Sequence, residues 1–222
     1  MPNSKLIAAI ALMTAVVSLA GCAGKIRYPS YYALDLPAPV SAANQPAPNQ
    51  PAPNQVTPTH GSAAVRQFDA PRFLRGGAIA YWEGPDQLGF YEYHRWAEDP
   101  RHAVTAAMVR EIQARGVFQS VDVFDGRESP EYLVKGTLEH LEEVDQGASV
   151  SIEVSLSAQL INLRTGEVLW QDTSSKTTNL DRRSVPGVVA EMSRNLEDAV
   201  QHLVSSMQDR LSARTMSSAV EH

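Results

Sequence analysis

Residues 150–160 read VSIEVSLSAQL, in which every second side chain is apolar and the others are serine, glutamate or glutamine. Because side chains alternate between the two faces of a β-strand, this stretch predicts a strand with one buried and one solvated face. Such strands are typical of antiparallel sheets. Residues 132–139 alternate similarly, and the hairpin sequence RTG at 164–166 leads into another apolar stretch. The sequence therefore predicts an antiparallel meander of three strands.

Two helices are predicted around this meander. Asp99 is a suitable N-cap and Pro100 suits the first helical position, while Gly116 can end the helix in a left-handed conformation. Apolar residues spaced three and four apart over residues 185–211 predict a second, longer amphipathic helix. Residues 213–222 are expected to form a flexible tail.

The order of the elements predicts the fold class. Further strands are expected near residues 31–36, 78–82, 87–93 and 118–123. Two helices that cover one face of a mainly antiparallel sheet give a two-layer α+β domain, which we place at residues 30–212. The length of 222 residues leaves room for one such domain with appendages.

Composition excludes several classes of protein. Asp and Glu outnumber Lys and Arg by 25 to 19, giving a formal net charge of −6. Binding to nucleic acid requires a basic face, so we expect no nucleic-acid partner. The single cysteine, Cys22, excludes an internal disulfide framework, a cysteine-rich zinc site and a CxxC redox pair.

The first residues of the chain predict an export signal. Residues 6–19 are uncharged and mostly apolar, which is too short for a membrane-spanning helix but suits a signal peptide. The next residues, LAGC at 19–22, resemble a bacterial lipobox. The resemblance implies a lipoprotein signal peptide at 1–21, cleavage between Gly21 and Cys22, lipidation of Cys22, and an acylated tether at 22–29. An ordinary secretory signal with a chance cysteine is the alternative.

Residues 37–62 are rich in proline and contain the unit PAPNQ twice, at 46–50 and 51–55. Such a composition has too little apolar bulk to offset the entropy of ordering, so we expect a disordered loop inside the domain. This interpretation requires the strand at residues 31–36 to pair with the sheet that forms after residue 65. The alternatives are a tether between anchor and domain, or a proline-rich ligand for a partner.

Motifs of catalysis and metal binding are missing from the sequence. No two of the six histidines have the spacing of metal ligands, and there is no GxSxG, phosphate-binding glycine loop or HExxH. We therefore predict no catalytic residue, no metal and no cofactor. Glu139, Glu142 and Glu143 are interpreted as a solvated acidic face.

Residues 91–100 contain three large aromatic side chains, an arginine and a histidine just before the first helix. Tyr93, Arg95 and Trp96 are candidates for a partner-binding surface. The structural alternative is that Tyr93 and Trp96 lock the corner between strand and helix while Arg95 pairs with Glu98 or Asp99.

Several of these features occur in an order that resembles the ABC-type transport auxiliary lipoprotein family. They are the lipobox, YYALD at 31–35, the corner at 93–100, GVFQSV at 116–121, the hairpin at 163–170 and VPGVV at 185–189. The PAPNQ repeat departs from the family pattern. Because Ala23 and not aspartate follows Cys22, the resemblance of the lipobox to those of other bacterial lipoproteins implies an anchor in the outer membrane that faces the periplasm.

The family resemblance also implies a function. It predicts a non-catalytic accessory component of an intermembrane lipid transport system, with an MCE-domain protein, an ABC permease and an ATPase as partners. An assembly or pilot lipoprotein of another envelope complex is the alternative, and a lipoprotein hydrolase is a third hypothesis. Unpaired strand edges and an apolar helix flank permit a homo-oligomer.

Overall fold

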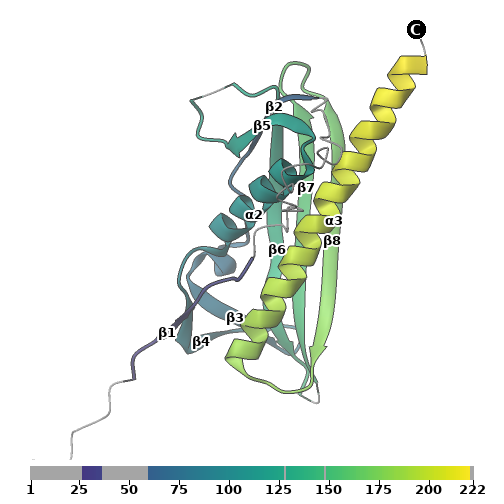
Figure 1. Cartoon of the computed structure of the whole chain (residues 1–222). Helices are drawn as coiled ribbons and strands as arrows, with labels where there is room; N and C mark the ends of the chain where they lie inside the picture. The colour runs from purple at the N-terminus through teal and green to yellow at the C-terminus, as the bar shows by residue number, and fades with distance from the viewer. Residues whose placement is uncertain (1–26, 37–59, 128, 148, 221–222) are drawn as a thin grey trace, which may run out of the picture.

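The computed structural model describes residues 27–36, 60–127, 129–147 and 149–220 (Figure 1). The strands are β1 (Ser30–Tyr32), β2 (His60–Val65), β3 (Ala78–Glu83), β4 (Gln87–Trp96), β5 (Phe118–Val123), β6 (Tyr132–Asp145), β7 (Val150–Asn162) and β8 (Val168–Leu180). The helices are the short 3-10 helix η1 (Arg72–Arg75), α2 (Pro100–Arg115) and α3 (Val185–Val220).

Strand β6 joins the sheet together. Along one edge it pairs with β7 over its whole length in antiparallel register, and β7 pairs in turn with β8. Along the other edge it pairs in parallel with β2 through its first residues and with β3 through its last. β2 continues to β5, and β3 continues to β4 and then β1. The sheet is mixed, and its antiparallel pairs hold most of the paired residues, as predicted.

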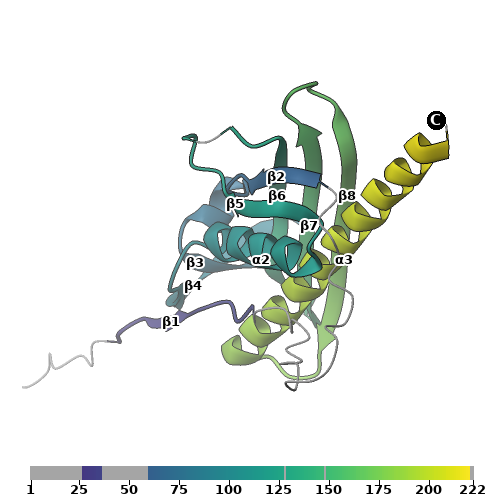
Figure 2. The ribbon, with the colours of Figure 1, turned by 45° about the horizontal axis from the view of Figure 1, so that its top comes forward.

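Both long helices cover one face of this sheet, and α3 crosses it diagonally (Figures 1 and 2). The side chain of Asp99 accepts a hydrogen bond from the backbone N–H of Arg101 at 2.9 Å and so caps α2. Gly116 ends α2 with φ of 65°, a conformation that costs glycine little. These two residues confirm the predicted bounds of the first helix.

The core lies between α3 and the strands β6 to β8. Ile152, Val154 and Leu156 of β7 are fully buried, as are Met192 and Leu196 of α3. The alternation in β7 and the periodicity in α3 therefore supply two facing apolar surfaces, which confirms the predicted two-layer α+β fold. The other face of β7 is less solvated than predicted, since Ser151 and Ser155 are also buried beside neighbouring strands.

Two predicted boundaries are wrong. Helix α3 continues to Val220, so the expected flexible tail is helical over residues 213–220. Residues 60–62 belong to β2 and not to the proline-rich loop, because β2 pairs in parallel with β5 from His60 onward. The ring of His60 packs 5.8 Å from that of Phe118, a tertiary contact that local composition does not reveal.

The predicted signal peptide, Cys22 and the PAPNQ units lie outside the described residues and remain predictions. Within the described part of the chain, none of the helices combines the length and the apolarity needed to cross a bilayer.

Candidate functional site

The first described residues form part of the sheet. Ser30, Tyr31 and Tyr32 of β1 pair in parallel with the last three residues of β4. The hydroxyl of Tyr32 lies 3.1 Å from Nδ1 of His94, and the carbonyl of Tyr32 accepts a hydrogen bond from the N–H of Ala97 at 2.7 Å. β1 is therefore an edge strand that closes the β4 side of the sheet (Figure 1).

The residues after β1 connect this edge to both helices. The N–H of Asp35 donates to Oγ of Ser193 on α3 at 3.1 Å, and the carbonyl of Leu36 accepts from Nη2 of Arg110 on α2 at 2.8 Å. Leu34, which precedes these two residues in the chain, is buried in the hydrophobic core. Residues 30–36 are thus part of the same folded domain as β4 and the two long helices.

The structure separates the three residues of the predicted partner surface. Trp96 is 5% exposed and belongs to the hydrophobic core, so it fixes the corner between β4 and α2. Tyr93 is half-buried and Arg95 is exposed. Solvent therefore reaches Tyr93 and Arg95 but hardly reaches Trp96. Asp99, one of the two acidic residues proposed as partners of Arg95, pairs with Arg101.

Strand β1 adds aromatic and cationic groups beside Tyr93 and Arg95. Tyr31 is the register partner of Arg95, so the two side chains share one face, and Tyr31 is 64% exposed. The guanidinium of Arg27 lies 5.9 Å from the centre of the Tyr93 ring, within cation–π range. We call Arg27, Tyr31, Tyr93 and Arg95 the N-terminal aromatic surface. Periodicity alone could not place Arg27 and Tyr31 there, because a pairing over some sixty positions brings them to β4.

The interpretation of the acidic residues as a solvated face is wrong for two of them. Glu142 and Glu143 are both 0% exposed. Glu143 accepts a hydrogen bond from the Tyr91 hydroxyl at 2.6 Å, and Nη2 of Arg183 lies 2.7 Å from its other oxygen. Burial, followed by the hydrogen bond with Glu143, raises the pKa of Tyr91 to about 12, so this phenol remains a donor at neutral pH. Together, Tyr91, Glu143 and Arg183 connect β4 and β6 to the segment that leads into α3.

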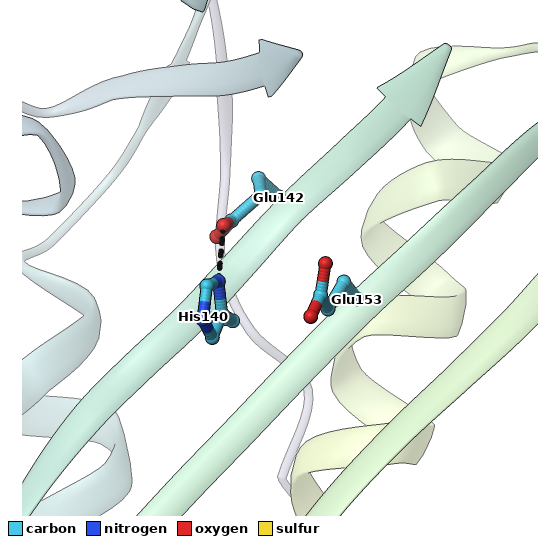
Figure 3. A group of neighbouring side chains, drawn as sticks. All are labelled: His140, Glu142 and Glu153. Carbon is cyan, nitrogen blue, oxygen red and sulfur yellow. Dashed lines mark hydrogen bonds and ion pairs between the residues drawn. The ribbon is translucent and has the colours of Figure 1, made fainter. Parts of the chain in front are cut away.

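Glu142 has a separate set of partners. Its carboxylate lies 2.6 Å from Nδ1 of His140 (Figure 3). It also accepts hydrogen bonds from Nε1 of Trp82 at 3.2 Å and from the backbone N–H of Leu141. Burial alone would lower the pKa of His140, but the hydrogen bond and charge of Glu142 outweigh it, and the pKa is raised. The carboxylate of Glu142 therefore stabilises the charged form of His140.

A groove elsewhere on the sheet is lined mainly by polar and charged side chains. Its charged residues include three cations and three anions: Arg66, Arg101, Lys135, Asp69, Asp125 and Asp172. Acyl chains bind to apolar linings, so this groove does not suit the tails of a lipid.

Residues 43–204 match the family model described as ABC-type transport auxiliary lipoprotein component. No curated protein sequence matches the chain.

Solved structures share the fold. The crystal structure of protein XCC0632 from Xanthomonas campestris superposes with a TM-score of 0.66 at 16% identity, covering 84% of this chain and 99% of that chain. The crystal structure of an uncharacterized protein gives a TM-score of 0.61 at 13% identity, covering 82% of this chain and 99% of that chain. At these identities the likeness extends to the fold alone.

Proposed function

Because the chain belongs to the ABC-type transport auxiliary lipoprotein component family, we propose that it is a non-catalytic accessory protein of an envelope system that carries lipid between two membranes. Cys22 bears the lipid anchor, in the outer membrane and facing the periplasm. The transport machinery consists of an MCE-domain protein, an ABC permease and an ATPase. The role of this chain is to dock that machinery through the N-terminal aromatic surface.

The observation that carries the docking role is the exposed combination of tyrosine and arginine at the β1–β4 edge. Tyr31 is 64% exposed, Arg95 is exposed, and neighbouring Tyr28 is 81% exposed. Tyrosine and arginine are enriched among the residues that contribute most binding energy in protein interfaces. Large side chains that are exposed to solvent contribute little to the stability of the fold, but they bury a large area when a partner covers them.

The position of the surface fits a protein held by a short tether. Arg27 follows Cys22 by five positions, and an extended chain spans at most about 3.6 Å per residue. The Cα atom of Arg27 therefore lies within about 18 Å of the predicted lipidated residue. A partner that docks at this surface is brought close to the membrane that holds the anchor.

The polar groove supports an accessory role over that of a lipid carrier. A carrier must shield acyl chains from water in an apolar cavity. The groove offers charged side chains instead, among them Lys135 and Asp172. We therefore propose that the partner moves the lipid. This chain binds the partner and holds it at the membrane.

Site-specific crosslinking in cells tests this function. A photoreactive amino acid replaces Tyr31 or Tyr93 in the full-length protein, and the crosslinked species are identified by mass spectrometry. The matched control replaces Val168, an exposed apolar residue that begins β8 at the β7–β8 hairpin. This hairpin lies at the other end of the molecule from β1 (Figures 1 and 2).

We expect an MCE-domain protein or a transporter subunit to be captured from Tyr31 and Tyr93 and not from Val168. Capture of a different envelope complex from the same positions would favour an assembly or pilot lipoprotein. Equal capture from all three positions would contradict docking through the N-terminal aromatic surface.

A further inference from the structure

We propose that His140, Glu142 and Glu153 form a binding site for a divalent transition-metal ion of the zinc type. The site lies on the face of the sheet opposite α3, since Glu153 alternates with Ile152 and Val154, which are buried against that helix. One nitrogen or oxygen from each of the three side chains lies within 4.8 Å of the others (Figure 3).

A β-bulge builds the site. The pairing of β6 with β7 shifts between Leu138 and His140, so Glu139 is an extra residue in β6. Leu138 faces Leu156 in the core, and regular alternation would direct residue 140 to the core as well. The shift instead pairs His140 with Ser155 and Glu142 with Glu153 on the opposite face, while Leu141 enters the core. Bulges commonly redirect side chains at functional sites.

The pairing of Glu142 with Glu153 places like charges directly across from each other in neighbouring strands. Such pairs destabilise a sheet unless a cation lies nearby. Glu142 is 0% exposed and His140 is its only ion-pair partner within the described residues. Neither Glu139 nor Glu153 forms an ion pair with a Lys or Arg of the described chain.

One imidazolium cannot balance these carboxylates. Glu142 lies 2.6 Å from Nδ1 of His140, Glu153 is the register partner of Glu142, and Glu139 accepts a hydrogen bond from Ser155, the register partner of His140. Three carboxylates therefore gather around one imidazole. Lys176 of β8 does not compensate for it, because its amino group pairs with Asp198 on α3. A divalent cation supplies the missing charge.

The chemistry of the ligands favours zinc over magnesium or calcium. Imidazole nitrogen suits zinc and related transition metals, whereas magnesium and calcium prefer oxygen ligands. Ligand atoms of a tetrahedral zinc site lie about 3.4 Å apart, so the side chains must close by roughly 1.5 Å or less. The side chain of His140 is 44% exposed and can adjust. Trp82 Nε1 and the N–H of Leu141 hold Glu142 in place, as outer partners orient metal ligands.

The test uses the tag-free, full-length protein in detergent, stripped with a chelator and titrated calorimetrically with zinc. We expect one equivalent to bind, with a rise in melting temperature, and cobalt(II) to give the visible spectrum of a four-coordinate site with a nitrogen ligand. Glu153→Gln and His140→Ala are expected to weaken binding by at least about tenfold, a loss that outer-shell changes alone produce.

The matched control is His202→Ala. His202 also lies beside a carboxylate, with Nε2 3.6 Å from Asp172, but it belongs to none of the metal-binding groups found among the described residues. This variant is expected to bind zinc as the unchanged protein does. Absence of zinc binding, equal binding of magnesium, an equal loss in the control, or unchanged binding by a folded Glu153→Gln variant would overturn the proposal. The cobalt spectrum of the unchanged protein decides the case if a variant does not fold, since a six-coordinate spectrum contradicts the site.

Discussion

Tyr31 and Arg95 are register partners in the parallel pairing of β1 with β4, although they stand 64 positions apart in the chain. The pairing makes the residues that follow the predicted anchor a part of the folded domain. It also places two exposed side chains on one face, where they form the N-terminal aromatic surface with Arg27 and Tyr93. The edge that is nearest to the anchor in sequence is therefore also the edge proposed to bind the partner.

This topology predicts that the two segments before β2 differ in their importance for stability. Deleting residues 46–55 shortens the connection between residues 36 and 60, and loop-closure entropy changes slowly with length. We expect the free energy of unfolding to change by about 0.5 kcal/mol. Deleting residues 31–36 removes Leu34 and an edge strand from the domain, so we expect a loss of several kcal/mol. Urea denaturation of the two full-length variants measures both values, and equal midpoints would contradict the pairing.

The buried Glu143 predicts a specific role for the hydroxyl of Tyr91. Tyr91→Phe removes a 2.6 Å hydrogen bond to a carboxylate that is 0% exposed. Hydrogen bonds to charged groups contribute about 1.5–3 kcal/mol, and we expect a loss of that size in the free energy of unfolding. Tyr93→Phe is the control, since it removes a hydroxyl from the same strand without touching Glu143. Equal effects of the two substitutions would show that the buried carboxylate does not depend on Tyr91.

The N-cap of α2 predicts how stability depends on pH. Partial burial alone would raise the pKa of Asp99, but hydrogen bonds from the side chain and backbone of Arg101, and its charge, lower the pKa below its usual value. A carboxyl whose pKa is lower in the folded state stabilises the fold above its unfolded pKa, near 4, and loses this contribution as pH falls through the folded value. Asp99→Asn can still cap the helix but has no charge.

We therefore expect Asp99→Asn to be less stable than the unchanged protein at pH 7, and the difference to shrink as pH falls from about 5 to 3. Thermal unfolding measured across this range checks the prediction. A difference that stays constant down to pH 3 would mean that the charge of Asp99 does not stabilise α2.

Gly136 occupies a position in β6 where even one added methyl group is too large. An added Cβ would overlap the ring of Phe68 and lie 2.7 Å from the carbonyl oxygen of Ser157. Phe68 is buried, and the Ser157 carbonyl belongs to the backbone of a central strand, so neither group moves easily. We expect Gly136→Ala to destabilise the protein by about 1–3 kcal/mol, as overpacking does. Gly126→Ala serves for comparison, because its strain is conformational and no atom lies within 4 Å of the added Cβ. An unchanged denaturation midpoint in Gly136→Ala would contradict the close packing of β6 on Phe68.

The sequence alone predicts the meander and both helices, because helix caps and the alternation of apolar residues involve only residues close together in the chain. Asp99, Pro100 and Gly116 define α2 through the chemistry of helix ends, and the alternation over residues 150–160 matches β7. The bulge at Glu139 interrupts the alternation of β6, and the burial of Glu142 and Glu143 depends on partners from other strands. Local patterns therefore could not predict that the side chains of Glu142 and Glu143 are buried.

The other features that the sequence did not predict depend on pairing between residues far apart in the chain. β2 begins at His60 because β5 and β6 lie beside it, although HGSAAV is a weak strand sequence by itself. Likewise, the tether sequence gives no sign that Arg27 lies over Tyr93. Such contacts arise from the arrangement of strands in the folded sheet, which composition and periodicity do not encode.

The central claim is that the N-terminal aromatic surface docks a transporter component, and equilibrium binding tests it most directly. The full-length lipoprotein, in detergent, is titrated with the purified MCE-domain protein of the same envelope. A double variant, Tyr93→Ala with Arg95→Ala, is compared with a control double variant, Val168→Ala with Arg164→Ala, which changes exposed residues of the β7–β8 hairpin.

Truncating a residue that dominates an interface costs at least about 2 kcal/mol, which corresponds to roughly a 30-fold change in Kd. We therefore expect Kd to rise at least about 30-fold in the Tyr93 and Arg95 variant and to stay unchanged in the control. Tight binding by the Tyr93 and Arg95 variant, or an equal loss in both variants, would contradict the assignment of the docking surface.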